Sequence, residues 1–257
     1  MSEVNGTMIK HLVDSYLKSR DFDRLTASQD QYRYWLRVLL ETEYEGETVG
    51  QLKYKKLTAP EAQVIYDTIS DRGITFANRI NAVARKVYNY GMKYGVVDKN
   101  PWSMIQTLTP APRKVMWQSE DVQRFLETAY SNFKTRGIGV IAHMAYEWAQ
   151  RIGDMRLLTW DRIDFENRVL HLEQSKRRSV VHLPISDELM GVLEQQNGLF
   201  DWQPYVAPNV NAKTQSGYAP YGLEVVSRVA KKIIIEAGLN PELRLADLRR
   251  TATTEMV

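Results

Sequence analysis

QRIGDMRLLTWDRID, residues 150–164, directly follows a run at 138–148 that is apolar almost all round. A helix that is apolar on every side lies in the centre of a domain, so we expect 138–148 to be buried. Arg151 follows that helix at once, and a guanidinium there needs a partner because burying it unpaired is very costly. Asp154, three residues on, is the partner that the spacing offers. An ion pair at a helix end is the simplest interpretation of these two residues alone.

Two further segments carry basic residues in unusual contexts. Residues 169–174 and 179–184 are rich in branched side chains, which predicts a β-hairpin. The turn of this hairpin is basic and consists of Ser175, Lys176, Arg177 and Arg178. Close to the end of the sequence, 246–251 reads Ala-Asp-Leu-Arg-Arg-Thr and includes Arg249.

In this order and spacing, the three segments resemble the motifs of the catalytic domain of tyrosine recombinases and phage integrases. The family's first motif is Arg, a small or apolar residue, Gly and an acid, then an apolar helix, Trp and Asp, as in 151–161. The second places a Lys on the turn between two strands and a Pro at the end of the second strand, which matches Lys176 and Pro184. The third reads His-x-Leu-Arg, a basic residue and Thr. Arg249 matches this motif, but Ala246 stands where the family has His.

The resemblance implies attack of a tyrosine hydroxyl on a DNA phosphodiester, with a transient phosphotyrosyl bond and without a metal or other cofactor. Arg151 and Arg249 would hold the non-bridging oxygens by forked hydrogen bonds, and Asp154 would orient Arg151. Lys176 would act as general acid toward the departing 5′ oxygen, with Arg177 as a substitute. A solvated turn is the alternative for the two turn residues.

No tyrosine of this sequence matches the family's nucleophile, which follows the third motif by some tens of residues. The last tyrosines, Tyr218 and Tyr221, precede Arg249. We therefore expect an incomplete copy of a recombinase, cut off at Val257 within the helix of the third motif. A natural DNA-binding remnant or regulator that cannot cleave DNA is the alternative, and Ala246 adds some weight to it.

Upstream of these motifs, residues 48–95 are distinctly basic. Apolar residues three and four apart from Ile80 to Tyr94 predict a helix that starts at Thr75. Its other faces carry amides and cations, including Asn81, suited to phosphate and base-edge contacts, although a solvated helix face is as good an interpretation of the charge alone. The residues predicted to bind DNA, here and around the later motifs, are Lys53, Asn78, Arg79, Arg85, Lys86, Arg177, Arg178 and Arg250.

The proline-rich segment NPWSMIQTLTPAPRK at 100–114 predicts a domain boundary, because each proline removes a backbone donor and disfavours helix before it. We expect a mainly α fold with a small antiparallel hairpin or sheet. Residues 1–111 would form a helical core-binding domain, with 1–47 as an optional N-terminal arm. Residues 112–257 would form a mostly helical, incomplete catalytic domain.

Composition sets outer limits on function. The 257 residues are 44% hydrophobic and 25% charged and contain no cysteine. Their net charge of +3 is too small to indicate a nucleic-acid partner by itself. No apolar run is long enough for a membrane span, so we expect a soluble cytoplasmic protein of a bacterial or phage-infected cell. The resemblance implies double-stranded DNA as partner, integration or excision of phage-type DNA as the reaction, and a homotetramer on paired sites. A helical protein-interaction module with merely solvated basic faces is the alternative from another class.

The histidines offer no metal site by their spacing. His143 falls in the apolar run, and His171 and His182 fall on the two strands of the predicted hairpin. None has a convincing partner by spacing, so we expect all three to be structural rather than ligands or bases.

Overall fold

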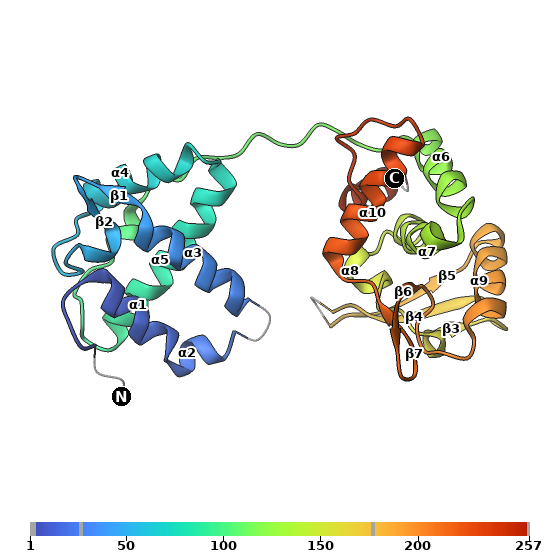
Figure 1. Ribbon diagram of the computed structural model, residues 1–257, viewed down its shortest axis with the longest axis horizontal. Coiled ribbons are helices and arrows are strands. Elements are labelled where there is room, and N and C mark those ends of the chain that lie inside the picture. The colour runs from blue at the N-terminus through green and yellow to red at the C-terminus, as the bar shows by residue number, and fades with distance from the viewer. Residues whose placement is uncertain (1–3, 26–27, 176–177, 256–257) are drawn as a thin grey trace. The chain divides into compact units, whose positions relative to one another are not determined.

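The computed structural model describes residues 4–25, 28–175 and 178–255. The chain divides into two compact units, Met1–Pro112 (unit 1) and Arg113–Val257 (unit 2), each with its own hydrophobic core (Figure 1). The prediction of a mainly α fold with small antiparallel sheets is confirmed. Among the described residues, no helix combines the length and the apolar character that crossing a bilayer requires.

Unit 1 is built around its longest helix, α5, which contacts α1, α3, α4 and the short helix η2. Helix α4 begins at a capping box, in which the backbone N–H of Thr58 donates to Glu61 Oε2 at 2.7 Å. Helices α1 to α3 contribute to the same core as α4 and α5. The elements of unit 1 are α1 (Ile9–Leu17), α2 (Arg20–Asp23), α3 (Gln29–Glu41), β1 (Glu43–Tyr44), β2 (Glu47–Thr48), η1 (Val49–Gln51), α4 (Ala59–Ser70), α5 (Ile74–Lys93) and η2 (Pro101–Met104).

Helix α5 begins one residue earlier than the sequence predicts, because Gly73 occupies the N-cap position with a positive φ of 132°. Ile80, Val83 and Val87 are buried as expected. Asn81, which the apolar periodicity predicts on the polar face of the helix, is also buried, so that prediction is wrong. At the other end, η2 belongs to the core of unit 1, with Trp102 fully buried. Residues 105–118, all of them described, form neither helix nor strand.

Unit 2 is built around α7, which contacts α6, α8, α9, α10 and α11. Its residues from Gly137 to Ala145 are all buried, which confirms the predicted buried helix. Figure 1 shows α7 across the middle of the unit, with the β-strands on one side of it and α6 and α10 on the other. The elements of unit 2 are α6 (Ser119–Tyr130), α7 (Phe133–Glu147), α8 (Ile152–Met155), η3 (Trp160–Arg162), β3 (Ile163–Asp164), β4 (Val169–Glu173), β5 (Val180–Pro184), α9 (Asp187–Phe200), β6 (Pro208–Thr214), β7 (Gly217–Pro220), α10 (Leu223–Glu236), η4 (Leu245–Asp247) and α11 (Leu248–Glu255).

The predicted hairpin is β4 and β5, joined by β3 into an antiparallel sheet of order β3-β4-β5. A second hairpin, β6 and β7, lies between α9 and α10. Its sequence lacks the alternation of a strand, and its pairing shifts register between Pro208 and Lys213. Packing against α7 stabilises it instead, which is a tertiary effect that local propensity does not reveal.

Candidate active site

A tight turn after α7 sets the position of Arg151. Ala149 adopts a left-handed conformation with φ of 48°, and the next N–H, that of Gln150, donates back to the carbonyl of Ala145 at 3.1 Å. This arrangement closes the end of α7 and turns the chain sharply. Arg151 then becomes the N-cap residue of α8. The buried helix and the turn thus fix the backbone of Arg151, while its side chain remains 29% exposed.

Arg151 and Asp154 form a loose ion pair. Arg151 Nη1 lies 3.8 Å from Asp154 Oδ2, beyond hydrogen-bond distance, and the Asp154 side chain is only 4% exposed. Both of these atoms are buried and have no hydrogen-bond partner among the described residues. The carboxylate therefore compensates the charge of Arg151 without occupying its donors. A half-buried guanidinium with an unused donor is suited to bind an anion.

Two hydrogen bonds tether the hairpin to the residues around Arg151. Asp154 Oδ1 accepts from Ser175 Oγ at 2.5 Å, and Gln150 Oε1 accepts from Gln174 Nε2 at 2.7 Å. Gln150, Gln174 and Asp154 are buried. Sequence reasoning missed the roles of Gln150, Gln174 and Ser175. Their only signal was that they adjoin Arg151 and Lys176, because the pairing itself depends on the fold.

The turn of the hairpin lies partly outside the described residues, since Lys176 and Arg177 are not described. Arg178 is exposed, has a left-handed φ of 52°, and its N–H donates to the carbonyl of Gln174 at 2.7 Å. The described base of the turn is therefore closed and tied to the Arg151 segment. The predicted role of Lys176 stays a prediction.

Helix α11 carries Arg249 and packs against α7 through buried side chains, including Leu248, Thr251 and Ala252. Arg249 is half-buried. Ala246, in η4, is exposed and lines a cavity to which Ile152, the residue after Arg151, also contributes. One residue from each of the first and third motifs therefore lines this cavity of unit 2, whereas Arg151 and Arg249 are not among its lining residues. An alanine at position 246 presents only a methyl group there, where the family has an imidazole.

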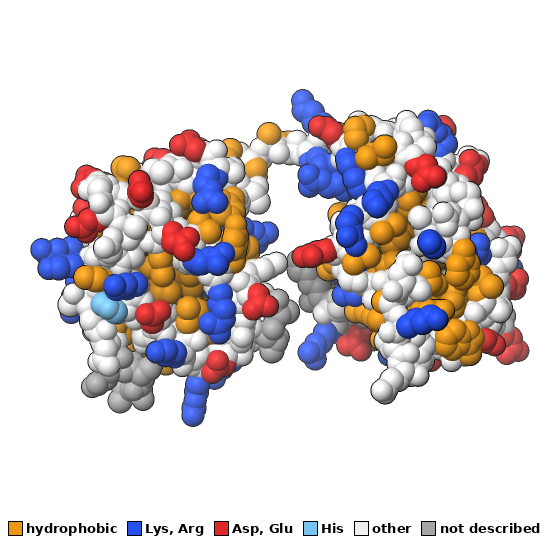
Figure 2. All heavy atoms as spheres, in the orientation of Figure 1, with side chains coloured by type: hydrophobic (Ala, Val, Ile, Leu, Met, Phe, Trp, Pro, Cys, Tyr) orange, Lys and Arg blue, Asp and Glu red, His pale blue; other side chains and the backbone are white. Residues whose placement is uncertain are grey.

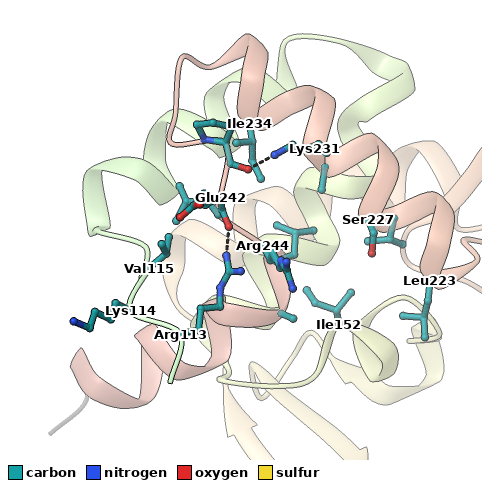
Figure 3. Close-up of a pocket in the computed structure, with 16 residues that line it drawn as sticks. Arg113, Lys114, Val115, Ile152, Leu223, Ser227, Lys231, Ile234, Glu242 and Arg244 are labelled. Atoms are coloured by element: carbon teal, nitrogen blue, oxygen red, sulfur yellow. Dashed lines mark hydrogen bonds between the residues drawn. The ribbon is translucent and has the colours of Figure 1, made fainter. Parts of the chain in front are cut away.

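This cavity has a volume of about 950 Å³ and is lined mainly by apolar residues of α10 and of the segment before η4 (Figure 3). Basic residues lie at the edge of the cavity, and two of them already form hydrogen bonds within the protein. Arg113 Nε donates to Asp247 Oδ2 at 2.9 Å and another guanidinium nitrogen to the carbonyl of Glu242, while Lys231 Nζ donates to the carbonyl of Pro241. The cavity therefore presents a mainly apolar surface, with Arg113 and Lys231 already hydrogen-bonded within the protein.

The residues predicted to bind DNA differ in whether their side chains already form hydrogen bonds within the protein. Of the described ones, Lys53, Arg79, Arg85, Lys86, Arg178 and Arg250 are exposed, and Lys86 Nζ also donates to Tyr32 Oη at 2.5 Å. The Asn78 side chain is hydrogen-bonded within unit 1, since it accepts from Tyr66 Oη at 2.6 Å and donates to the carbonyl of Leu108 at 2.9 Å.

Arg250 likewise donates to backbone carbonyls, those of Arg113 at 3.1 Å and Val115 at 2.7 Å, and so holds the segment before α6 to α11. Lysine and arginine side chains are visible over the part of unit 2 around α10 and the C-terminal end, whereas those on the visible face of unit 1 are interspersed with acidic ones (Figure 2).

The histidines fall into two kinds. His143 is buried and hydrogen-bonded to Tyr130 Oη at 3.1 Å, which confirms a structural role, and burial lowers its pKa, opposed by Glu188 and Glu147. His171 and His182, in contrast, lie directly opposite one another, so the expectation that they lack a partner is wrong. In the part of the chain that the structure describes, no three His or acidic residues cluster as metal ligands.

The chain is similar in sequence to one protein family and in fold to several solved structures. The profile of the phage integrase family matches residues 116–257. A structure of a lambda integrase (75–356) dimer bound to a COC′ core site matches with a TM-score of 0.78 at 16% identity, covering 96% of this chain and 89% of that one. A lambda integrase tetramer bound to a Holliday junction matches with a TM-score of 0.78 at 16% identity, covering 97% and 73%. The Tn1549 transposon integrase in complex with a circular intermediate DNA matches with a TM-score of 0.76 at 14% identity, covering 98% and 87%. No curated protein sequence matches.

Proposed function

The chain belongs to the phage integrase family, and on that basis we propose that it acts in site-specific DNA recombination, in which strands are cut and rejoined through a phosphotyrosyl intermediate. The observation that carries the proposal is the state of Arg151. Its guanidinium is half-buried, follows a buried helix, and is charge-compensated by Asp154 while one buried nitrogen lacks a hydrogen-bond partner among the described residues. Such a group is prepared to receive a phosphodiester oxygen.

Arg151 and Arg249 would bind the two non-bridging oxygens of the phosphate that is attacked. Two planar guanidiniums can stabilise the negative charge that builds up in the transition state, and lysine cannot reproduce their forked geometry. Asp154 would orient Arg151, and Lys176 would protonate the departing 5′ oxygen. The hydrogen bond from Ser175 to Asp154 holds the residue directly before Lys176 next to the Arg151 segment, and the bond from Gln174 to Gln150 adds to this tether. Both contacts support this role for Lys176.

Ala246 removes one hydrogen-bond donor from the phosphate site relative to the family's pattern. An imidazole at this position could donate to a non-bridging oxygen, and a methyl group cannot. The remaining charge stabilisation would then come from the arginines and Lys176, so we propose that any cleavage by this site is more sensitive to loss of one arginine than in a site with the histidine. This substitution is also the observation that favours the second candidate function, a DNA-binding regulator that does not cleave.

We assign no tyrosine of this chain as the nucleophile. Tyr221 is fully buried and burial raises its pKa to about 12, which opposes formation of an attacking oxygen. Tyr218 lies on β7, outside the motif segments.

The partner we propose is double-stranded DNA, held mainly by exposed cations of α5 and its neighbours. The lambda integrase structures are a dimer on a core site and a tetramer on a Holliday junction. By analogy, we propose that four protomers assemble on two duplexes during the reaction. Phosphate contacts of this kind release counterions, so the affinity must fall steeply with salt.

The test is the salt dependence of binding to a duplex oligonucleotide, measured by fluorescence anisotropy with the whole chain. Arg79→Ala and Lys86→Ala are each expected to reduce the slope of log affinity against log salt by about 1. Lys134→Ala, an exposed cation outside the predicted DNA-binding residues, is the matched control and should leave the slope unchanged. Arg151→Ala should keep most of the affinity, because binding is spread over many cations.

Binding that does not respond to salt, or an equal response to all substitutions, would favour the helical interaction module instead. The cleavage step is tested separately by denaturing gels of the same mixtures. A covalent adduct between DNA and this chain would contradict the statement that none of its tyrosines is the nucleophile.

A further inference from the structure

Two histidines face each other across the hairpin that leads to Lys176. His171 on β4 pairs with His182 on β5 in the antiparallel register, and their Nδ1 atoms lie 2.7 Å apart. The ring centroids are 4.8 Å apart and the planes are inclined by 75°. Both side chains are exposed, so solvent reaches the pair.

The pair lies on the solvent face of the sheet. Side chains alternate along a strand, and on β4 Leu170 and Leu172 are buried whereas His171 and Glu173 are exposed. Because Val169 pairs with Asp164 of β3, that carboxylate belongs to the same face as His171. Two imidazoles with acidic residues nearby make this face attractive to a cation.

We propose that His171 and His182 together bind a divalent transition-metal ion such as Zn²⁺. Imidazole nitrogen is a preferred ligand of such ions, with Zn–N distances of about 2.0–2.1 Å. In a tetrahedral site those distances place two nitrogens about 3.3 Å apart, so the observed separation would have to widen by only about 0.6 Å. Cross-strand pairing therefore holds the two ligands close to the required geometry before any metal arrives.

The protonation of the pair accommodates the ion without a co-reactant. In the hydrogen bond one Nδ1 donates and the other accepts. A metal ion bound to both Nδ1 atoms requires the donating ring to carry its proton on Nε2 instead, which exchange with water allows. Among the described residues no third histidine or carboxylate completes a three-ligand set with the pair, so water takes the other positions. The site is therefore open and exchangeable, unlike a closed structural zinc site.

Binding at this position would link the two strands of the hairpin. The pair lies on the strands that lead to Lys176, and the tethers of Gln174 and Ser175 hold the base of the turn beyond it. A bound ion would therefore slow the separation of β4 from β5. Metal binding itself does not depend on the proposed recombination, so either can fail without the other.

The experiment is titration of the whole, metal-free chain with ZnCl₂ in an isothermal calorimeter, in a buffer that does not chelate zinc. We expect one Zn²⁺ per chain, reversed by EDTA. His171→Ala and His182→Ala should each weaken binding at least tenfold, since loss of even an outer partner of a metal ligand costs about 10–100-fold. The matched control is His11→Ala in unit 1, which should leave the affinity unchanged. The chain contains four histidines, so the set is small enough to test completely.

A second measurement distinguishes zinc bound by the two histidines from zinc bound nonspecifically to the protein surface. Hydrogen exchange of the backbone amides in 169–184 should slow with Zn²⁺ in the parent chain and not in the His171→Ala and His182→Ala variants. The proposal is overturned if no binding occurs up to millimolar Zn²⁺, if both hairpin variants bind as well as the parent, or if His11→Ala abolishes the signal.

Discussion

The ion pair between Arg151 and Asp154 is the feature whose energy can be worked out most directly. Unit charges 3.8 Å apart interact by about 4 kcal/mol at an effective dielectric constant of ~20. Because the Arg151 side chain is 29% exposed, water screens this interaction, and we expect about 1–2 kcal/mol to remain. Arg151→Ala should therefore destabilise unit 2 by roughly that amount, since it leaves the buried carboxylate without its counter-charge.

A double-mutant cycle isolates the pair. Asp154→Asn removes the charge but keeps an oxygen that can accept from Ser175, so in the Arg151→Ala background it should restore most of the lost stability. Scanning calorimetry of the four variants gives the unfolding free energy, and each kcal/mol is expected to move the unit 2 transition by about 2–4 °C. Effects that add within about 0.5 kcal/mol would refute the coupling and the claim that Asp154 holds Arg151 electrostatically.

Three further predictions concern the stability of unit 2. Ala149→Gly should stabilise unit 2 by about 0.5–1 kcal/mol, because glycine adopts the observed φ of 48° without the clash of a Cβ. The control Ala145→Gly, inside α7, should destabilise unit 2, and a loss of stability in both variants would contradict this explanation. Burial lowers the pKa of His143 below its usual 6.5, so the unfolded chain takes up a proton first as the pH falls. The unfolding free energy should therefore decrease from pH 6.5 toward pH 5, by at most about 1.4 kcal/mol per pH unit, and His143→Gln should remove that part of the slope. Gln174→Leu should cost about 1–3 kcal/mol by leaving the buried oxygen of Gln150 unpaired, and should speed backbone exchange across 169–184; unchanged exchange would mean that the tether does not hold the hairpin.

Local signals in the sequence predicted much of the fold. The apolar stripe from Ile80 to Tyr94, the apolar run at 138–148 and the branched stretches of the hairpin each encode their element within a few neighbouring residues, and each element is present. These signals depend on backbone hydrogen bonding and on the period of apolar side chains, which operate at short range. The same locality explains why the motif arginines could be selected from the sequence.

Contacts between distant segments were not accessible in this way. Asn81 carries an amide but is buried, because the neighbours of α5 cover that side of the helix, and Arg250 holds carbonyls 135 and 137 residues away. The pairing of His171 with His182 needs the register of the hairpin, which a shift of one residue would have abolished. Periodicity identifies a face, but the fold decides what lies against it.

Binding of one phosphate by both Arg151 and Arg249 can be tested with a crystal structure of the chain soaked with tungstate, a tetrahedral anion located by its anomalous signal. We expect one strong tungsten site with oxygens about 3 Å from both guanidiniums, the usual hydrogen-bond distance, and the loss of that site in Arg151→Ala. Tungstate bound only elsewhere, with Arg151 still facing Asp154 alone, would show that the two arginines do not share a phosphate.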